Sequence, residues 1–316
     1  MNVFDGIDAI PASAQKTIVS IGVFDGVPRG HQAVIARIVD WANALGAVPG
    51  VITFRFPPKT RPDDPAPLIT SLAHRLLLFE RFGLQFACIL DFDAKVSAIP
   101  ARDFVETILV GKLNIAGIVA GSDNRFGYRG EGDVNLLRTL GVTYGFNVDV
   151  IDRPLTGDRL ISSSNIREAI RAGDIATAAD MLGRPVSVYG TVVRGDGRGR
   201  TLGFPTANID VGPEVRLPLG VYSTIVVFDD GRRLPAVTNI GFRPTFKPAT
   251  DGQPIAPLIE THIPDFRDDL YGKKIEALFI DKLRNEMAFG SRDALAEQIR
   301  KDIDRLNRNV ITELNK

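Results

Sequence analysis

The sequence is poor in cysteine and histidine. Among its 316 residues there is one cysteine, Cys88, and there are three histidines. A single cysteine cannot form a disulfide within the chain, which is typical of proteins from a reducing compartment. Because Cys88 lies in the apolar run FACIL, we expect a buried structural thiol rather than a reactive one. Three histidines are too few for a histidine-rich metal site.

Neither sign of charge is in excess, and long apolar runs are missing. Lys plus Arg and Asp plus Glu are balanced at 38 each, so no overall field favours binding to nucleic acid or to an anionic membrane. No run approaches the roughly 18 apolar residues of a membrane span, and the first residues lack the basic start and apolar core of a secretory signal. The sequence therefore predicts a cytoplasmic protein without nucleic-acid or membrane partners, and it leaves the oligomeric state open.

The length of the chain indicates two domains, and the first part alternates strand-like and helix-like segments. Apolar runs at 17–24 and 48–54 predict buried strands, and residues 31–45 carry apolar side chains at the spacing of one helix face. Further strands are expected at 86–92, 115–121 and 146–152, and further helices at 72–82, 100–113 and 134–140. This alternation predicts a parallel, doubly wound α/β sheet, in which ligands bind at the carboxyl ends of the strands.

The pattern changes after residue 185. Short β-rich runs at 187–193, 220–228, 233–240 and 274–280 are separated by glycine, proline and charged turns, which predicts an antiparallel sheet or a small barrel. Helical spacing returns at 291–306 and closes the chain. We therefore expect a domain boundary near Arg184, with domains at 1–184 and 185–316.

A glycine-rich stretch, GDGRGRTLGFPTAN, occupies residues 195–208. Its glycines leave backbone N–H groups accessible to phosphate oxygens. Thr206 and Asn208 alternate in an extended segment, so both side-chain oxygens are expected on one face, where they suit Mg²⁺. On glycine content alone, a hairpin with a β-bulge is the favoured interpretation, because short glycine patterns are common.

The full string resembles the signature of the riboflavin kinase family. The resemblance continues, in the family's order, through GVY (220–222), NIGFRPTF (239–246) and ETHIPDFRDDLYG (260–272). It implies a β-barrel kinase with a C-terminal helix that converts riboflavin and ATP to FMN and ADP. By the same resemblance, Thr206 and Asn208 hold Mg²⁺ and Glu260 is the general base. The implied phosphate- and nucleotide-binding residues are Gly195, Gly197, Arg198, Gly199, Arg200, Thr201, Gly203, Phe204 and Asn239.

The segment SIGVFDGVPRGHQAVI joins a predicted strand to a predicted helix, the usual place for a phosphate site. It resembles the turn G-x-F-D-G-V-H-x-G-H of bacterial FMN adenylyltransferases, which precede a riboflavin kinase in the bifunctional FAD synthases. GSDNRFG (121–127) and SSSNIREAI (162–170) extend the likeness. It implies a Rossmann-like nucleotidyltransferase domain that makes FAD from FMN and ATP. The implied site residues are Gly22, Phe24, Asp25, Gly26, Gly30, His31, Asp123, Ser162, Ser163, Ser164 and Arg167. A helix start capped by Asn165 is an alternative role for the serine run.

Several residues depart from the adenylyltransferase pattern. Pro28 replaces a histidine, TFRFPP at 53–58 replaces T-F-D-P-H-P with Arg55 and Pro57, and Asn124 and Leu160 replace a phenylalanine and an arginine. Three interpretations stay open. The domain makes FAD with Arg29 or Arg55 supplying positive charge, it is a catalytically silent nucleotide- or flavin-binding regulatory module, or it acts on another phosphorylated substrate.

Overall fold

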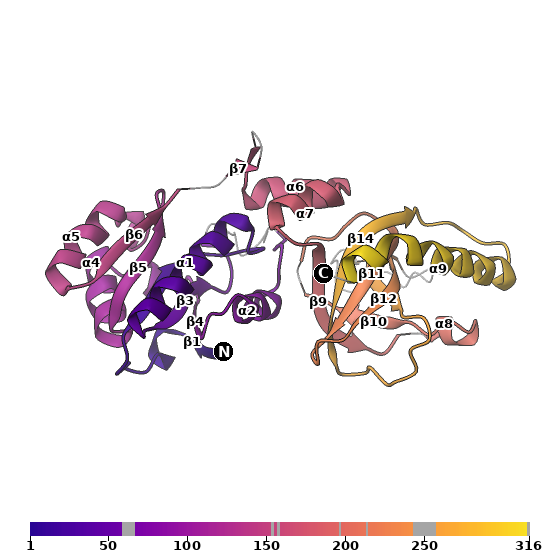
Figure 1. Ribbon diagram of the computed structural model, residues 1–316, viewed down its shortest axis with the longest axis horizontal. Coiled ribbons are helices and arrows are strands. Elements are labelled where there is room, and N and C mark those ends of the chain that lie inside the picture. The colour runs from indigo at the N-terminus through magenta and orange to yellow at the C-terminus, as the bar shows by residue number, and fades with distance from the viewer. Residues whose placement is uncertain are drawn as a thin grey trace. The chain divides into compact units, whose positions relative to one another are not determined.

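A computed structural model describes residues 1–58, 67–152, 155–156, 159–195, 197–212, 214–242 and 257–314. The chain forms two compact units (Figure 1). The first unit consists of Met1–Pro67 and Arg75–Ser163, and the second consists of Leu68–His74 and Ser164–Lys316. Helices long and apolar enough to cross a membrane are absent from the described ranges.

The first unit contains the predicted parallel sheet. Its six strands are ordered β1-β4-β3-β2-β5-β6, and every pairing between them is parallel. The strands are β1 (Asn2–Asp5), β2 (Thr17–Ile21), β3 (Val48–Phe54), β4 (Phe86–Leu90), β5 (Ile115–Gly121) and β6 (Asn147–Ile151). The helical segments are η1 (Ile7–Ala9), α1 (Arg29–Leu45), α2 (Leu72–Arg81), α3 (Ala94–Ser97), α4 (Ala101–Asp103), η2 (Phe104–Lys112), η3 (Tyr128–Gly130) and α5 (Val134–Tyr144). The first three residues of α2, 72–74, group with the second unit. A two-stranded sheet is formed by β7 (Leu155–Thr156) and β8 (Arg159–Leu160).

Two apolar clusters cover the two faces of this sheet. In β2, Ile18 packs with α1 and α2, whereas the next residue, Val19, packs with η2 and α5. Figure 1 shows α1 on the opposite side of the sheet from α4 and α5. Alternate residues of one buried strand thus serve both cores, which confirms the doubly wound fold. Cys88 of β4 is fully buried, and burial raises the pKa of its thiol to about 12, so it is a structural thiol as expected.

Three local expectations for the first part of the chain need correction. β2 ends at Ile21 rather than at Phe24, because Phe24 adopts a left-handed backbone with φ 54° that no strand allows. The helix expected after Pro100 is α-helical only over Ala101–Asp103 and then becomes π-helical. Asn165 is not a cap, because α6 (Ser163–Ala172) begins two residues before it.

The second unit is built on a closed antiparallel barrel, as predicted from its short β-rich runs. Its strands are ordered β10-β13-β12-β11-β14-β9. They are β9 (Val186–Val193), β10 (Ala207–Asp210), β11 (Gly220–Phe228), β12 (Arg233–Gly241), β13 (Leu258–His262) and β14 (Lys274–Arg284). Three threonines inside the barrel are linked through their hydroxyls, Thr224 to Thr238 at 2.8 Å and Thr238 to Thr261 at 2.9 Å. They satisfy one another's polar groups where water has no access.

Helices complete this unit. They are α6 and α7 (Ile175–Leu182), the single-turn α8 (Arg198–Thr201) and α9 (Arg292–Leu314). Figure 1 shows α9 lying across the barrel, and its residues Leu306 and Val310 pack on Val221, Ile225 and Val237 of β11 and β12. The units divide between Ser163 and Ser164, so α6 and α7 group with the barrel. The expected domain boundary near Arg184 stays a prediction.

Candidate active sites

The barrel aligns three of the expected kinase residues side by side. Glu260 of β13 is paired with Asn208 of β10 on one side and with Asn239 of β12 on the other. Directly opposed residues of antiparallel strands share one face and have Cβ atoms about 5 Å apart. The sheet therefore brings one carboxylate and two carboxamides together on the outer face of the barrel, although Asn208 and Asn239 stand 31 positions apart in the sequence.

The glycine loop (residues 197–206) lies in the hairpin connection between β9 and β10, which pair antiparallel, and it contains the single turn α8. Gly197 precedes the turn α8 with φ 68°, and Arg200 and Thr201 of that turn are exposed. A Cβ on Gly199 would lie 2.3 Å from the Phe204 carbonyl oxygen and 3.3 Å from Thr206 Oγ1. A Cβ on Gly195, just before the loop, would lie 2.2 Å from Asn208 Nδ2. Only glycine allows the backbone to approach Thr206 and Asn208 this closely.

Thr206 and Asn208 have the properties of ligands for a hard cation. The Asn208 side chain is buried, and its Oδ1 lacks a hydrogen-bond partner within the described part of the chain. Buried carbonyl oxygens are normally satisfied, and a magnesium ion that also binds substrate phosphates takes few protein oxygens. The residues present therefore fit Mg²⁺. Clusters of three or more His, Cys, Asp or Glu side chains suited to a metal are absent from the described residues.

A cavity of about 360 Å³, here called the barrel cavity, opens in front of Glu260. Gly197, Gly199, Phe204, Thr206, Asn239 and Glu260 line it, whereas Gly195, Arg200, Thr201, Gly203 and Asn208 do not. Its apolar lining residues are Leu202, Phe204, Val221, Val237, Phe242, Leu258, Met287, Phe289, Leu295 and Ile299. An apolar chamber with a polar edge suits a flat heteroaromatic ligand that carries a hydroxylated chain.

His262 connects the glycine loop to strand β13. Its ring lies edge-on to Phe204 at 5.6 Å, and Nδ1 lies 2.8 Å from the Pro205 carbonyl oxygen. A carbonyl only accepts, so Nδ1 carries the proton and donates it. His262 thereby holds the loop beside the strand residue Glu260. The Arg198 side chain and residues 243–246 of the expected kinase motifs lie outside the described residues.

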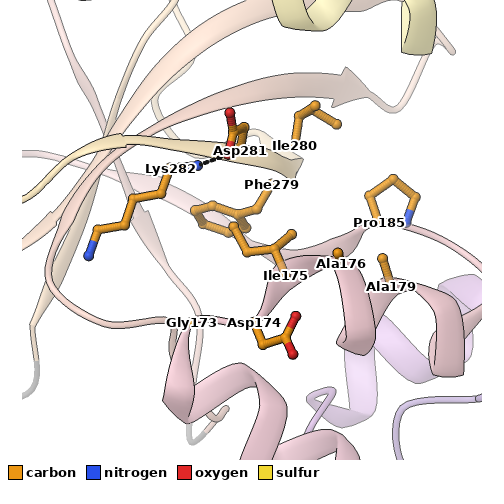
Figure 2. Close-up of a pocket in the computed structure, with 10 residues that line it drawn as sticks. All are labelled: Gly173, Asp174, Ile175, Ala176, Ala179, Pro185, Phe279, Ile280, Asp281 and Lys282. Atoms are coloured by element: carbon orange, nitrogen blue, oxygen red, sulfur yellow. Dashed lines mark hydrogen bonds between the residues drawn. The ribbon is translucent and has the colours of Figure 1, made fainter.

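A second cavity of about 380 Å³ in the same unit lies between α7 and β14 (Figure 2). Its acidic groups are already engaged. Asp174 accepts the Thr177 N–H at 3.0 Å as the cap of α7, and Asp281 accepts the Lys282 N–H at 2.8 Å. Figure 2 shows the Lys282 side chain pointing away from Ile175 and Phe279. The arrangement offers apolar surface but no group poised for chemistry.

In the first unit, the expected nucleotide turn (residues 22–27) is a constrained loop between β2 and α1. Phe24 and Val27 both have positive φ, 54° and 41°, which is costly for residues with a Cβ. Phe24 is buried, with its ring against His31 at 5.0 Å and Phe79 at 5.6 Å. Strain of this kind is typical of functional loops, and the turn leads directly into the amino terminus of α1, where Gly30 and His31 lie.

Side chains from four elements hold the carbonyls of this turn. Arg75 Nη1 donates to the Val23 carbonyl, which also accepts Thr53 Oγ1 at 3.1 Å. Gln32 Nε2 donates to Val27 O at 2.9 Å, and Ser163 Oγ lies 3.4 Å from Asp25 O. These contacts determine the path of the turn, and they include Asp25 and Ser163 from the expected site.

Arg75 is the main residue that the sequence did not indicate. It is fully buried, and its Nη2 donates to the carbonyls of Phe54 at 2.9 Å and Arg55 at 3.3 Å. Burial lowers the pKa of Arg75 to about 10, while the Asp25 carboxylate opposes this, so the guanidinium stays charged at neutral pH. The sequence HRLLLF gave one signal, a cation inside an apolar helix face.

Arg55 and Asn124, two departures from the family pattern, have structural partners. Arg55 pairs with Asp91 (Nε to Oδ1, 2.9 Å) and Asp5 (Nη2 to Oδ1, 2.6 Å). Its charge is thus balanced by two carboxylates, which argues against its acting as the replacement cation. Asn124 Nδ2 donates to Ile21 O at 2.9 Å at the end of β2.

The remaining residues expected in this site follow strands of the first unit or lie in α6. Asp123 follows β5, with its Oδ1 3.3 Å from where a Gly121 Cβ would stand. Ser162 immediately precedes α6, whereas Ser164 and Arg167 lie within α6 in the second unit. The roles of Gly22, Gly26, Asp123, Ser162, Ser164 and Arg167 stay predictions.

Comparisons with known proteins agree with both halves of this description. A family model described as FAD synthetase matches residues 10–165, and one described as riboflavin kinase matches residues 182–310. Proteins named bifunctional riboflavin kinase/FMN adenylyltransferase match from Escherichia coli strain K12, with 34% identity, and from Pseudomonas fluorescens, with 35% identity; each match covers 96% of both chains. The chain belongs to the bifunctional riboflavin kinase/FMN adenylyltransferase family. As a member of this family it is an enzyme of flavin cofactor biosynthesis.

The family fold also extends to a solved structure. A crystal structure described as a macrolide-efflux protein from Streptococcus pneumoniae shares 28% identity and a TM-score of 0.80, and the match covers 98% of this chain and 99% of that one. Within the riboflavin kinase/FMN adenylyltransferase chain, most of α6 and most of α7 fall between the ranges of the two family models.

Proposed function

We propose that the second unit transfers the γ-phosphoryl group of ATP to the 5′-hydroxyl of riboflavin, with Glu260 as the general base. The observation that supports this most directly is the position of Glu260, which lines the barrel cavity and is flanked in register by Asn208 and Asn239. An alcohol attacks a phosphoryl group once a carboxylate accepts its proton. Glu260 is half-buried, so it contacts both the cavity and the surrounding barrel.

Each remaining part of the site has a role in this proposal. The apolar walls of the barrel cavity take the isoalloxazine ring, and Asn239 and Glu260 face the ribityl hydroxyls. The backbone N–H groups of the glycine loop face the phosphates. Thr206 Oγ1 and Asn208 Oδ1 would hold Mg²⁺, which when bound supplies positive charge to the phosphate oxygens.

Replacing Glu260 tests the kinase proposal. Glu260→Gln keeps the size of the side chain but accepts no proton, so kcat for FMN formation should fall by about 10² to 10⁴, measured by flavin chromatography with riboflavin and MgATP. Glu297→Gln is a matched control, because Glu297 is exposed and pairs with Lys301 on the surface of α9. Equal rates in Glu260→Gln and wild type would refute the assignment of the base.

We also propose that the first unit adenylylates FMN to FAD, at a lower rate than the kinase step. The constrained turn 22–27 and the amino terminus of α1 support this, because together they offer N–H groups to a phosphate chain. The FMN phosphate is already ionised, so the reaction needs positive charge and donors more than a base. Pro28 and Pro57 supply no donor, which accounts for the lower expected rate.

A time course of flavin products separates this second proposal from its alternative. The expected result is FMN first and FAD later, in the cytoplasmic setting that the composition predicts. If FMN accumulates normally and excess FMN gives no FAD, the adenylyltransferase proposal fails. Measurable binding of ATP without turnover would then favour a regulatory module, and turnover of a different phosphorylated substrate would favour the third interpretation.

A further inference from the structure

A buried ion pair connects helix α9 to one wall of the barrel cavity. The Asp302 side chain is 1% exposed and receives three short contacts from Arg284 of β14: Nε to Oδ1 at 3.1 Å, Nε to Oδ2 at 3.0 Å and Nη2 to Oδ2 at 2.9 Å. Gln298, one helical turn before Asp302, donates Nε2 to Oδ1 at 2.9 Å. The carboxylate is therefore saturated by donors whose geometry is fixed.

The Arg284 guanidinium, held by Asp302, also contacts the chain segment that follows β14. Its Nη1 donates to the Asn285 carbonyl at 3.1 Å, and its Cζ lies 5.7 Å from the centroid of the Phe289 ring. Arg284, Glu286, Met287 and Phe289 all line the barrel cavity. We call residues 284–289 the cavity wall. One end of the guanidinium thus holds a helix, and the other end holds the backbone and an aromatic side chain of this wall.

A buried ion pair adds little net stability, because the cost of removing two charges from water offsets their attraction. What such a pair does is fix the orientation of the two side chains, since a planar guanidinium and a carboxylate fit together in few orientations. Asp302 and Arg284 lie among apolar residues of α9 and the barrel, where an aliphatic pair would fill the same space. An ion pair at this place therefore indicates that the orientation of Arg284, and with it the cavity wall, is controlled.

We propose that Asp302 is a positioning residue for the flavin substrate: through Arg284 it fixes the cavity wall against which the ring of riboflavin binds. The inference rests on the proposed placement of riboflavin in the barrel cavity. It concerns the flavin specifically, because the nucleotide is expected at the glycine loop, whereas the hydrogen bonds described for Asp302 go to Arg284 and Gln298.

The test compares three single variants of the full-length enzyme. In Asp302→Asn the amide no longer accepts charge-assisted bonds, and in Arg284→Lys a single ammonium replaces the planar fork. We expect each to raise KM for riboflavin by about tenfold, with kcat and KM for ATP within about twofold, because binding geometry is lost while the base and the loop remain. Glu297→Gln, which breaks the exposed 2.8 Å pair with Lys301 on the same helix, should leave all three constants unchanged.

A double variant separates positioning from folding. Arg284→Met with Asp302→Leu replaces the pair by apolar side chains, and it should unfold within a few degrees of wild type while retaining the raised KM for riboflavin. If KM returns to the wild-type value in this variant, the pair has only a structural role and the inference is overturned. Equal increases in KM for ATP and for riboflavin would overturn it too. Failure of the kinase proposal would appear separately, as an active Glu260→Gln enzyme.

Discussion

The hydroxyl oxygen of Thr206 is a proposed Mg²⁺ ligand that a single substitution can remove. Thr206 lines the barrel cavity, and its Oγ1 lies close to Gly199 in the glycine loop. Thr206→Val keeps the shape of the side chain and removes the oxygen, so the Mg²⁺ concentration for half-maximal FMN formation should rise by about tenfold or more. Thr206→Ser keeps the oxygen and should stay close to wild type. Equal Mg²⁺ dependence in the two variants would show that Thr206 does not bind the metal.

His74 gives a pH-dependent prediction at the scale of the residue. It is fully buried in the second unit, with Nε2 3.1 Å from Glu276 Oε1 and Nδ1 3.8 Å from Glu214 Oε1, so Glu276 is its closer partner. Burial lowers the pKa of His74, but its interactions with Glu214 and Glu276 raise it by more, to a net value above the ordinary 6.5. Folding therefore strengthens proton binding, and the resulting stability is complete below pH 6.5 and is lost as pH rises through the folded-state pKa.

The measurement is hydrogen exchange of the second unit, corrected for intrinsic exchange, from about pH 6 to 8. Ser187 of β9 and Glu276 of β14 contact His74, so the protection of amides in these two strands against exchange should decrease as pH rises. In Glu276→Gln this decrease should be smaller, because the closer carboxylate is gone. His31→Gln, which changes a histidine of the first unit, should leave the decrease in protection of β9 and β14 as large as in the wild type. A pH-independent wild type would contradict the assignment.

Residue type alone could not reveal which charged side chains are buried. Asp302 and Asp304 stand two positions apart in the same helix and look equivalent in the sequence, yet Asp302 is 1% exposed and Asp304 lies on the surface. Which of them is buried depends on the position of Arg284, at the end of β14, relative to α9. That position is set by the tertiary structure. The candidates Thr206, Asn208 and Glu260 were identified because a motif marks them, and their roles stay predictions.

Among the elements, those with continuous burial were predicted most accurately. β3, β5 and β11 have the expected bounds, because nearly every residue in them is buried and apolar. β1 was missed, since its short sequence NVFD is mostly exposed at the sheet edge. β14 runs four residues past the expected end, and bulges in its pairing with β11 allow this extension. Closure of the barrel depends on the pairings of β10 with β13 and of β9 with β14, which join segments far apart in the sequence and which no local pattern encodes.

The glycine loop supplies a prediction at the scale of the element. In Gly199→Ala the new Cβ would stand 2.3 Å from the Phe204 carbonyl oxygen, so the backbone of the loop must move. FMN formation should fall by at least about tenfold, because a displacement near 1 Å misplaces the phosphate donors. Gly290→Ala is the control, since its Cβ would meet no atom within 4 Å. Equal kinase activity of the two variants would show that the loop is not held in this conformation for catalysis.

At the scale of the whole molecule, two products report separately on the two units. FMN reports on the second unit and FAD on the first, so each unit serves as the folding control for the other. This matters most for the first unit, where Arg75 and Thr53 hold the turn 22–27 in a constrained path but Pro28 and Pro57 replace two expected histidines. The question is whether the missing hydrogen-bond donors alone limit the rate of FAD formation by the first unit.

The double variant Pro28→His with Pro57→His addresses this question. Pro28 precedes α1 and its carbonyl accepts the Gln32 N–H at 3.0 Å, a bond that a histidine at this position retains. Arg55 should stay, because an aspartate there would place a third carboxylate beside Asp5 and Asp91. Each added donor to the α-phosphate of ATP is worth roughly 10² in rate. We therefore expect FAD formation to rise by at least that factor, with FMN formation unchanged. If the variant binds ATP but still makes no FAD, the first unit is a binding module whose loss of chemistry extends beyond these two residues.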